Sequence, residues 1–223
     1  MKDFRPQTLF SLEHTLARPI LQDKENVWDA LSQIGDFIIK LQESLGDDYT
    51  EIAPQVFVSK TAKIAPTASI TGPCIIGHNT EVRHCAFIRG NALVGENCVV
   101  GNSTELKNVI IFDNVQVPHY NYVGDSILGY RSHMGAGSIT SNVKSDKTLV
   151  CIKNGQDIIE TGRKKVGAFL GDFVEVGCGT VLCPGAVIGK NCSIYPLSMV
   201  RGVVEANSIY KNQGEVAAKL EEN

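Results

Sequence analysis

Branched aliphatic residues recur at every sixth position through the middle of the chain. The spacing is unbroken from Val58 to Leu106, and a small or compact residue follows each aliphatic four positions later, except at Ile110. A period of six matches neither the 3.6-residue repeat of a helix nor the alternation of a simple strand. It predicts a hexapeptide solenoid of short parallel strands coiled around an aliphatic core. The nine aliphatics are Val58, Ile64, Ile70, Ile76, Val82, Ile88, Val94, Val100 and Leu106.

Three hexads make one triangular coil, so residues 18 apart should stack on neighbouring coils at roughly 4.8 Å. The rhythm slips to steps of five at Ile111 and Leu128, and it runs again from Leu170 to Val200. Steps of five indicate tightened corners, and lapses in a regular pattern often mark functional sites. We therefore predict an all-β fold, a parallel β-helix over residues 54–203.

The ends of the chain follow other patterns. Apolar residues from Val27 to Leu45 alternate at spacings of three and four, which predicts one helix that begins near Asp23 and ends at Gly46. We expect this N-terminal helical segment, residues 1–50, to cover the bottom coil or another subunit, because solenoid ends need capping. Residues 204–223 should form a C-terminal cap or tail, with a short helix around 215–220.

The hexads stop over residues 143–165, where the sequence is charged. We predict a loop extruded from one corner of the solenoid, with a small strand pair of its own. Long loops inside compact domains are usually functional or disordered.

Composition narrows the function classes. A net charge of −3 gives no general attraction for nucleic acid or an acidic membrane. No apolar run approaches the ~20 residues that span a bilayer, and the first ten residues lack a signal-peptide core. We therefore expect a cytoplasmic protein. The seven cysteines form no CxxC pair and should act as small reduced side chains. A zinc site would need ligands from a neighbouring subunit, since His78 and His84 lie on different faces of one coil.

Two cations are predicted to stack at one edge of the solenoid. Arg89 and Lys107 each follow an interior aliphatic directly, and they are 18 residues apart. Cations about 5 Å apart repel each other unless an anion joins them. Phosphate fits, because Arg can bind it through two hydrogen bonds and Lys as a point charge. The alternative is a pair of solvated surface cations.

Counting also predicts a column of His84, Asn102 and His119, each third in its hexad. A histidine titrates near neutral pH, so His119 could take a proton from an amine or a hydroxyl. The alternative is an inert surface histidine.

Several stretches resemble a known family. VPHYNYVGD (117–125), HMGAGSITSN (133–142), VGNSTELKN (100–108) and AFIRG (86–90) resemble the acetyltransferase half of the bifunctional glucosamine-1-phosphate acetyltransferase/N-acetylglucosamine-1-phosphate uridyltransferases. With ETGRKKVGAFLGD (160–172), the chain is closer still to the solenoid domains of archaeal-type sugar-1-phosphate nucleotidylyltransferases. The resemblance covers roughly residues 54–203. It implies a left-handed β-helix that assembles as a homotrimer, with active sites between subunits.

The resemblance also implies an activity. The family transfers the acetyl group of acetyl-CoA, its cosubstrate, to the amine of a hexosamine 1-phosphate, and no metal is expected. By position, His119 matches the general base and Glu105 its acidic neighbour, while Arg89 and Lys107 match the residues that hold the phosphate. The remaining matches are a sugar contact at Tyr122, the junction of sugar and acetyl group at Asn142, and the pantetheine lining at Ala136.

Three positions depart from the family pattern. His133 replaces a sugar-binding Asn, Val143 replaces a Tyr, and Cys178 replaces a Ser that contacts the cofactor. These departures leave the proton chemistry in place and leave the identity of the amino sugar open.

The family's bifunctional members also carry an N-terminal nucleotidyltransferase domain with a Gly-rich loop, and here only residues 1–50 and a short connection precede the solenoid. We expect an acetyltransferase of UDP-N-acetylglucosamine biosynthesis without nucleotidyl transfer. Two alternatives stay open. One is a non-catalytic sugar-phosphate-binding or regulatory solenoid, and the other is an acyltransferase for a nucleotide-linked amino sugar.

Overall fold

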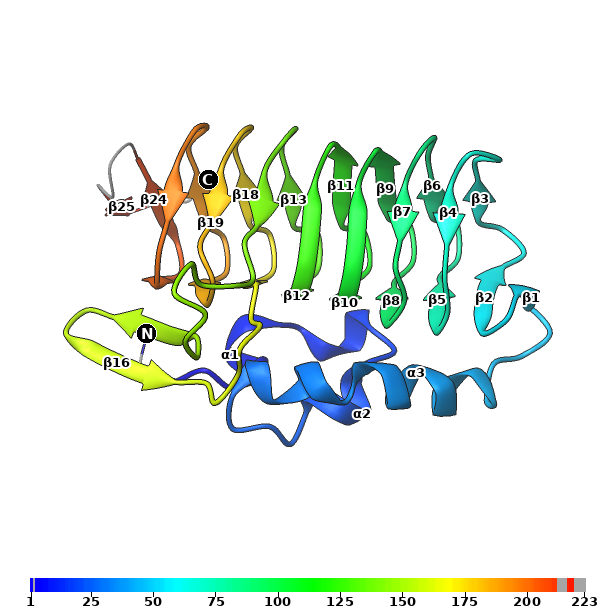
Figure 1. Cartoon of the computed structure of the whole chain (residues 1–223), viewed down its shortest axis with the longest axis horizontal. Helices are drawn as coiled ribbons and strands as arrows, with labels where there is room; N and C mark the ends of the chain where they lie inside the picture. The colour runs from blue at the N-terminus through cyan, green and yellow to red at the C-terminus, as the bar shows by residue number, and fades with distance from the viewer. Residues whose placement is uncertain (2, 212–215, 219–223) are drawn as a thin grey trace.

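The chain coils into a three-sided solenoid of parallel strands, stacked along the long axis of the molecule (Figure 1). The computed structural model describes residues 1, 3–211 and 216–218. The predicted parallel solenoid is confirmed, and so is the stacking of residues 18 apart, since Ile70 pairs with Ile88 and Val82 with Val100. The interior aliphatics are buried except Ile64 and Ile70, in the second and third hexads, which are partly buried.

The three faces differ in what they turn outward. The first face is largely polar and consists of β3 (Lys63–Ile64), β6 (Glu81–Val82), β9 (Val99–Asn102), β11 (Gln116–His119), β13 (His133–Met134), β18 (Glu175–Val176), β21 (Ser193–Ile194) and β24 (Ser208–Tyr210). The second face is mixed and consists of β4 (Ser69–Ile70), β7 (Phe87–Ile88), the start of β10 (Glu105–Ile111), the start of β12 (Tyr122–Leu128), β14 (Ile139–Thr140), β19 (Val181–Leu182) and β22 (Met199–Val200).

The third face is apolar on both sides. It consists of β2 (Val56–Ser59), β5 (Cys74–Ile76), β8 (Ala92–Val94), the ends of β10 and β12, β17 (Ala168–Leu170), β20 (Ala186–Ile188) and β23 (Val203–Val204). From β5 to β20 the outward residue at the centre of each strand is buried, and these residues stack in one ladder. Its members are Ile75, Leu93, Ile110, Ile127, Phe169 and Val187.

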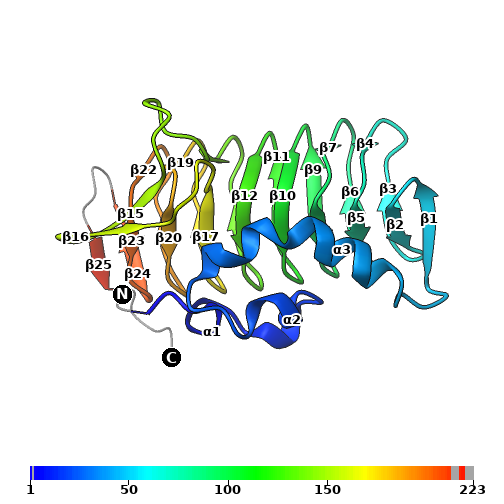
Figure 2. The same cartoon turned by 60° about the horizontal axis from the view of Figure 1, so that its bottom comes forward.

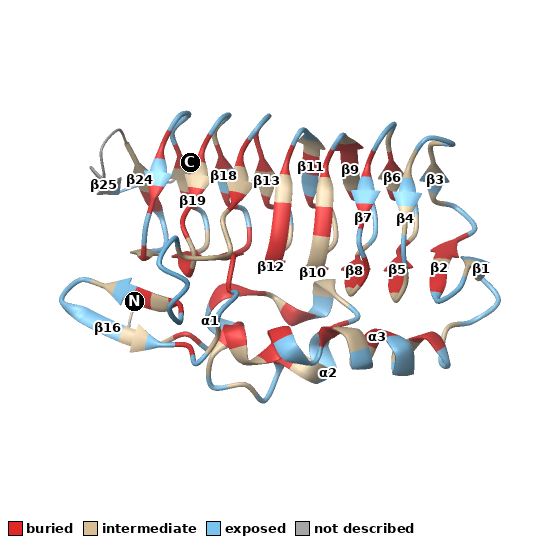
Figure 3. Cartoon of the chain, viewed as in Figure 1, coloured by how far each residue is buried: buried red, intermediate tan, exposed pale blue. Residues whose placement is uncertain are grey.

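The N-terminal segment covers this ladder. It contains α1 (Pro6–Leu9), η1 (Leu12–His14), α2 (Arg18–Leu21), η2 (Val27–Ser32) and α3 (Ile34–Gln42), and α3 runs along the solenoid over β5, β8 and β10 (Figure 2). Figure 3 shows buried residues on both sides of the contact. Trp28 lies 6.4 Å from Phe169 between ring centroids. The expected position on the bottom coil or another subunit is wrong, because the apolar third face offers the segment a larger surface to bury.

The single helix expected from Asp23 to Gly46 is also wrong. Asn26 and Asp29 form a capping box that begins η2 at Val27, and the chain restarts as α3 after Gln33. A β-carbon at Gly35 would lie 2.6 Å from the Asn91 side chain, so α3 approaches a corner of the solenoid closely. Docking on the coils therefore sets where each helix begins and ends.

Two coils have a tightened corner, as the steps of five predicted. β10 and β12 each run without a break from the second face to the third. Other corners turn through residues with positive φ, among them Asn79, Asn97 and Asn114. Asparagine tolerates this left-handed conformation better than most residues.

The segment between Asn142 and Val166 leaves the solenoid as a loop. It carries an antiparallel hairpin, β15 (Cys151–Asn154) and β16 (Asp157–Glu160), which is the small strand pair that the sequence predicted. The Val166 N–H donates to the Asn142 carbonyl at 3.1 Å and closes the base of the loop.

Antiparallel strands lie at both ends of the solenoid. β1 (Tyr49–Ala53) pairs with β2, and β25 (Val216–Ala218) pairs with β24. The short helix expected around 215–220 is wrong for Val216–Ala218, because the pairing with β24 satisfies that backbone as a strand. The rest of that expected helix lies outside the described residues. None of the helices in the described part of the chain combines the length and apolarity needed to cross a bilayer.

Candidate functional site

Arg89 and Lys107 lie side by side at the corner between the second and third faces, which we call the Arg89 corner. The Arg89 N–H donates to the Leu106 carbonyl at 2.8 Å, so the two cations follow each other on adjacent coils as the spacing predicted. Each also has a carboxylate. Arg89 Nη1 lies 2.8 Å from Glu105 Oε1, and Lys107 Nζ lies 3.5 Å from Asp125 Oδ2. The Glu105 carboxylate raises the pKa of the Arg89 guanidinium.

Asp125 connects the polar side chains of this corner. Its carboxylate is buried and accepts hydrogen bonds from the side-chain amides of Asn108 at 3.0 Å and Asn142 at 2.5 Å. Asn142 Nδ2 also donates to the Tyr122 hydroxyl at 3.1 Å. The structure thus brings Arg89, Glu105, Lys107, Tyr122 and Asn142 together around a carboxylate that the sequence interpretation missed. Lys107 pairs with Gly124, because this coil is one residue shorter than 18, and Asp125 follows directly, so counting that allows for the step of five could have found it.

The Tyr122 hydroxyl is held in its neutral form. Burial raises the pKa of Tyr122, and the Asp125 charge raises it further. A protonated phenol beside an amide is a hydrogen-bonding group that a sugar hydroxyl can match.

His119 lies at a different corner, between the first and second faces, which we call the His119 corner. The Gly137 N–H donates to the His119 carbonyl at 3.0 Å, and the Gly179 N–H donates to the Ala136 carbonyl at 2.8 Å. His119, Ala136 and Cys178 therefore follow one another up a single exposed column.

The second face separates His119 from the two cations within one subunit. His119 comes five residues before Gly124, which pairs with Lys107, and this stretch spans up to about 16 Å of extended chain. The side chains of His119 and Arg89 therefore do not meet in the single chain.

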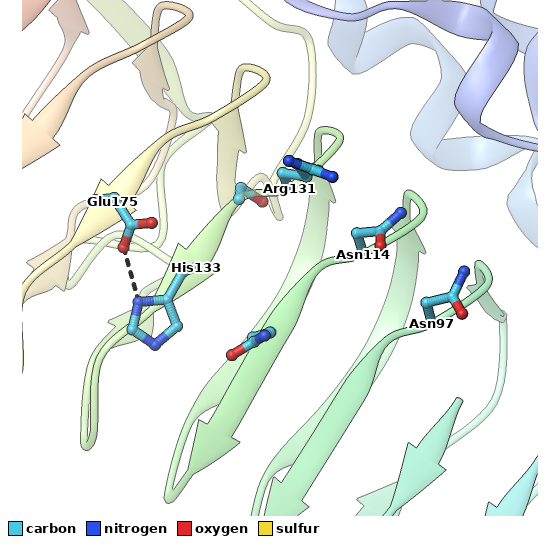
Figure 4. A pocket seen from close by; sticks show the side chains of 7 residues that line it. Asn97, Asn114, Arg131, His133 and Glu175 are labelled. Carbon is cyan, nitrogen blue, oxygen red and sulfur yellow. Dashed lines mark hydrogen bonds and ion pairs between the residues drawn. The ribbon is translucent and has the colours of Figure 1, made fainter. Parts of the chain in front are cut away.

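His133 lies on the first face, apart from both corners. Its Nδ1 atom is 2.8 Å from Glu175 Oε2, on the next coil (Figure 4). The two side chains line an open hollow of about 380 Å³, together with Asn97, Asn114, Gln116, Arg131 and Ser132. The position that the family resemblance links to sugar binding is thus occupied here by a hydrogen-bond partner of Glu175.

A second hollow adjoins the Arg89 corner. It measures about 460 Å³, and Lys107 and Asp125 form one of its walls. Leu31 and Ser32 of the N-terminal segment and residues 163–165 of the loop form the others.

Comparisons with known proteins agree with this architecture. The sequence profile of the GMPPB C-terminal domain matches residues 70–161. The bifunctional protein GlmU of Methanococcus maripaludis is 34% identical over 196 residues, which is 86% of this chain and 47% of the relative. A bifunctional sugar-1-phosphate nucleotidylyltransferase/acetyltransferase of Sulfurisphaera tokodaii is 31% identical over 74% of this chain and 41% of its own length.

The chain spans about half the length of these curated relatives. A weaker structural likeness, with a TM-score of 0.43 and 19% identity, relates 75% of the chain to 81% of a hexapeptide transferase family protein from Anaplasma phagocytophilum. The resemblance inferred from the motifs is confirmed by the sequence relatives: the chain is a hexapeptide-repeat solenoid that resembles the acetyltransferase domain of GlmU.

Proposed function

We propose that this protein is an acetyl-CoA-dependent N-acetyltransferase whose acceptor is an amino-sugar 1-phosphate. The observation that carries the proposal is the stacked pair of Arg89 and Lys107, with Tyr122 and Asn142 beside it. Two cations on adjacent coils suit a phosphate, and a neutral phenol with an amide suits the attached sugar. The Sulfurisphaera tokodaii relative, named as a bifunctional sugar-1-phosphate nucleotidylyltransferase/acetyltransferase, supports the same substrate class.

The proposal requires an assembly. His119 and Arg89 lie at opposite edges of the second face, so a complete site needs the His119 corner of one subunit beside the Arg89 corner of another. A cyclic homotrimer makes such contacts between unlike edges, three times over. Exposed apolar side chains on the second face and its edge support this contact, since Phe87, Tyr120, Leu197 and Met199 are each at least 43% exposed.

In the proposed reaction His119 accepts the proton that the sugar amine loses as its nitrogen bonds to the acetyl carbonyl carbon. The carbon–sulfur bond then breaks, and the same proton goes to the departing sulfur. Backbone N–H groups in the turn at Ala136 would stabilise the oxyanion. Binding of the phosphate by Arg89 and Lys107 orients the amine toward the thioester. Cys178 follows Ala136 in the exposed column and would contact the cofactor. Glu105 holds Arg89 in place.

Thiol release from acetyl-CoA tests this function. We expect release in the presence of glucosamine 1-phosphate or another amino-sugar 1-phosphate, and none with the same sugar lacking its phosphate. The absence of release with every amino-sugar phosphate would contradict the proposal.

A second candidate is a non-catalytic solenoid that binds a sugar phosphate. The hydrogen bond between His133 and Glu175 favours it, because His133 is engaged on the first face, away from Tyr122 and Asn142. Phosphate-dependent sugar binding without thiol release would identify this function.

A further inference from the structure

The loop that leaves the solenoid at the Arg89 corner returns with three consecutive cations, Arg163, Lys164 and Lys165. We infer that these residues form a second anion subsite beside Arg89 and Lys107, so that the corner as a whole takes a diphosphate. The inference rests on the proposed function for its first phosphate position, and it deepens that function by naming the substrate class.

The hollow joins the two positions. Lys107 stacks on Arg89 at the corner and also lines the hollow of about 460 Å³, as do Arg163, Lys164 and Lys165. An anion bound between Arg89 and Lys107 would therefore lie beside the hollow. A second phosphoryl group attached to it has room to enter.

The charge balance of the hollow favours an anion. Four of its lining side chains are cationic and one, Asp125, is anionic. The Asp125 carboxylate is already engaged by Lys107, Asn108 and Asn142. Within the part of the chain that the structure describes, Arg163, Lys164 and Lys165 have no carboxylate partner.

Arg163 shows how these cations are positioned. Its guanidinium donates to two neutral acceptors of the N-terminal segment, Ser32 Oγ at 3.0 Å and the Asp29 carbonyl at 3.3 Å. These bonds orient the side chain and leave its charge uncompensated. The loop and the N-terminal segment therefore meet at the cationic wall of the hollow.

The backbone on either side of the three cations is fixed to the fold. The Val150 N–H donates to the Arg163 carbonyl, and the Gly167 N–H donates to the Asp125 carbonyl, each at 2.8 Å. A β-carbon at Gly167 would lie 2.1 Å from the Gly124 carbonyl oxygen, so only glycine permits this approach. The fold thus holds like charges near one another, and a bound polyanion would offset their repulsion.

The diphosphate belongs to the acceptor, because in the proposed function Arg89 and Lys107 hold the phosphate of the sugar. A nucleoside diphosphate sugar carries two linked phosphoryl groups, one for Arg89 and Lys107 and one for Arg163, Lys164 and Lys165.

Isothermal titration calorimetry with inorganic phosphate and inorganic pyrophosphate tests the subsite without any turnover. At fixed ionic strength we expect the wild-type protein to bind pyrophosphate about tenfold more tightly than phosphate. The variant Lys164→Ala/Lys165→Ala should lose about tenfold in pyrophosphate affinity and less than about twofold in phosphate affinity.

The control is Lys60→Ala/Lys153→Ala, which removes the same charge from exposed positions outside the hollow. Equal affinity of the wild-type protein for the two anions, or an equal loss in the control, would overturn the inference. Failure of the thiol-release assay would leave the binding difference in place, so the two proposals fail separately.

Titrations with uridine diphosphate and with CoA identify the source. A loss confined to uridine diphosphate in the Lys164→Ala/Lys165→Ala variant assigns the subsite to a nucleotide-linked acceptor. A loss confined to CoA would overturn the assignment of the diphosphate to the acceptor. No loss for either ligand would overturn the inference.

Discussion

The Asn142 side-chain amide lies 2.5 Å from the Asp125 carboxylate, and this contact ties the residue before the loop to the coil below it. Asp125 also pairs with Lys107, so one buried carboxylate orients both a predicted phosphate ligand and a predicted sugar contact. The geometry of the Arg89 corner therefore depends on a residue that need not touch the substrate.

The first prediction concerns the charge of Asp125. Since burial and the Asp125 charge both raise the pKa of Tyr122, the variant Asp125→Asn should lower that pKa while Tyr122 stays buried. Ultraviolet titration of the phenols measures the change, with Tyr122→Phe in each background to identify the signal among the six tyrosines. An unchanged Tyr122 titration would mean that Asp125 does not act on the hydroxyl.

The second prediction concerns the phosphate. Replacing Arg89 by Ala removes a cation beside Lys107, and we expect KM for the sugar phosphate to rise about tenfold or more, with a smaller change in kcat. Arg83→Ala is a matched control. Like Arg89, Arg83 pairs with a glutamate, in this case Glu81, but it follows a strand of the first face. Similar KM values for the two variants would remove Arg89 from the phosphate site.

The periodicity of six predicts the solenoid because it is a local property of the chain. The position of each interior aliphatic is determined by its own hexad and does not depend on residues far along the chain. The sequence also indicates the apolar third face, because the residue before the interior aliphatic is apolar in every third hexad, as at Ile75, Leu93 and Phe169. The docking of the N-terminal segment depends on this face, and the pattern of the helix alone does not reveal it.

The site was predicted in part for a similar reason. Counting by 18 finds residues on one column, and it correctly stacks Lys107 on Arg89. It does not compare different columns. His119 belongs to a hexad of the first face and Arg89 to one of the second, so the two residues lie at different corners of a single chain. The periodicity of the sequence does not predict contacts between subunits.

The third prediction concerns the base of the loop. Gly167→Ala places a methyl group against the Gly124 carbonyl, and we expect a loss of about 1–3 kcal/mol in the free energy of unfolding. Urea unfolding measures it. Gly46→Ala is the control, because no atom lies within 4 Å of its β-carbon position, and its effect should stay within about 0.5 kcal/mol. Equal stability of the two variants would show that the loop base can shift without cost.

The last prediction tests whether the site is shared between subunits. His119→Ala should lower kcat by about a hundredfold or more, because it removes the base, and the trimer should remain intact in size-exclusion chromatography. Arg89→Ala should be impaired for a different reason, the loss of phosphate binding.

If each site takes His119 from one subunit and Arg89 from another, a trimer assembled from both variants contains some sites with both residues intact. Random assembly from equal amounts gives about a quarter of the sites in that state. Thiol release at low sugar-phosphate concentration, measured after the two variants are unfolded and refolded together, should therefore recover to about a quarter of the wild-type rate. Each variant refolded alone controls for the procedure. A site built within one subunit cannot be restored by mixing, because no chain carries both residues, so the absence of recovery in well-assembled mixed trimers would contradict the shared site.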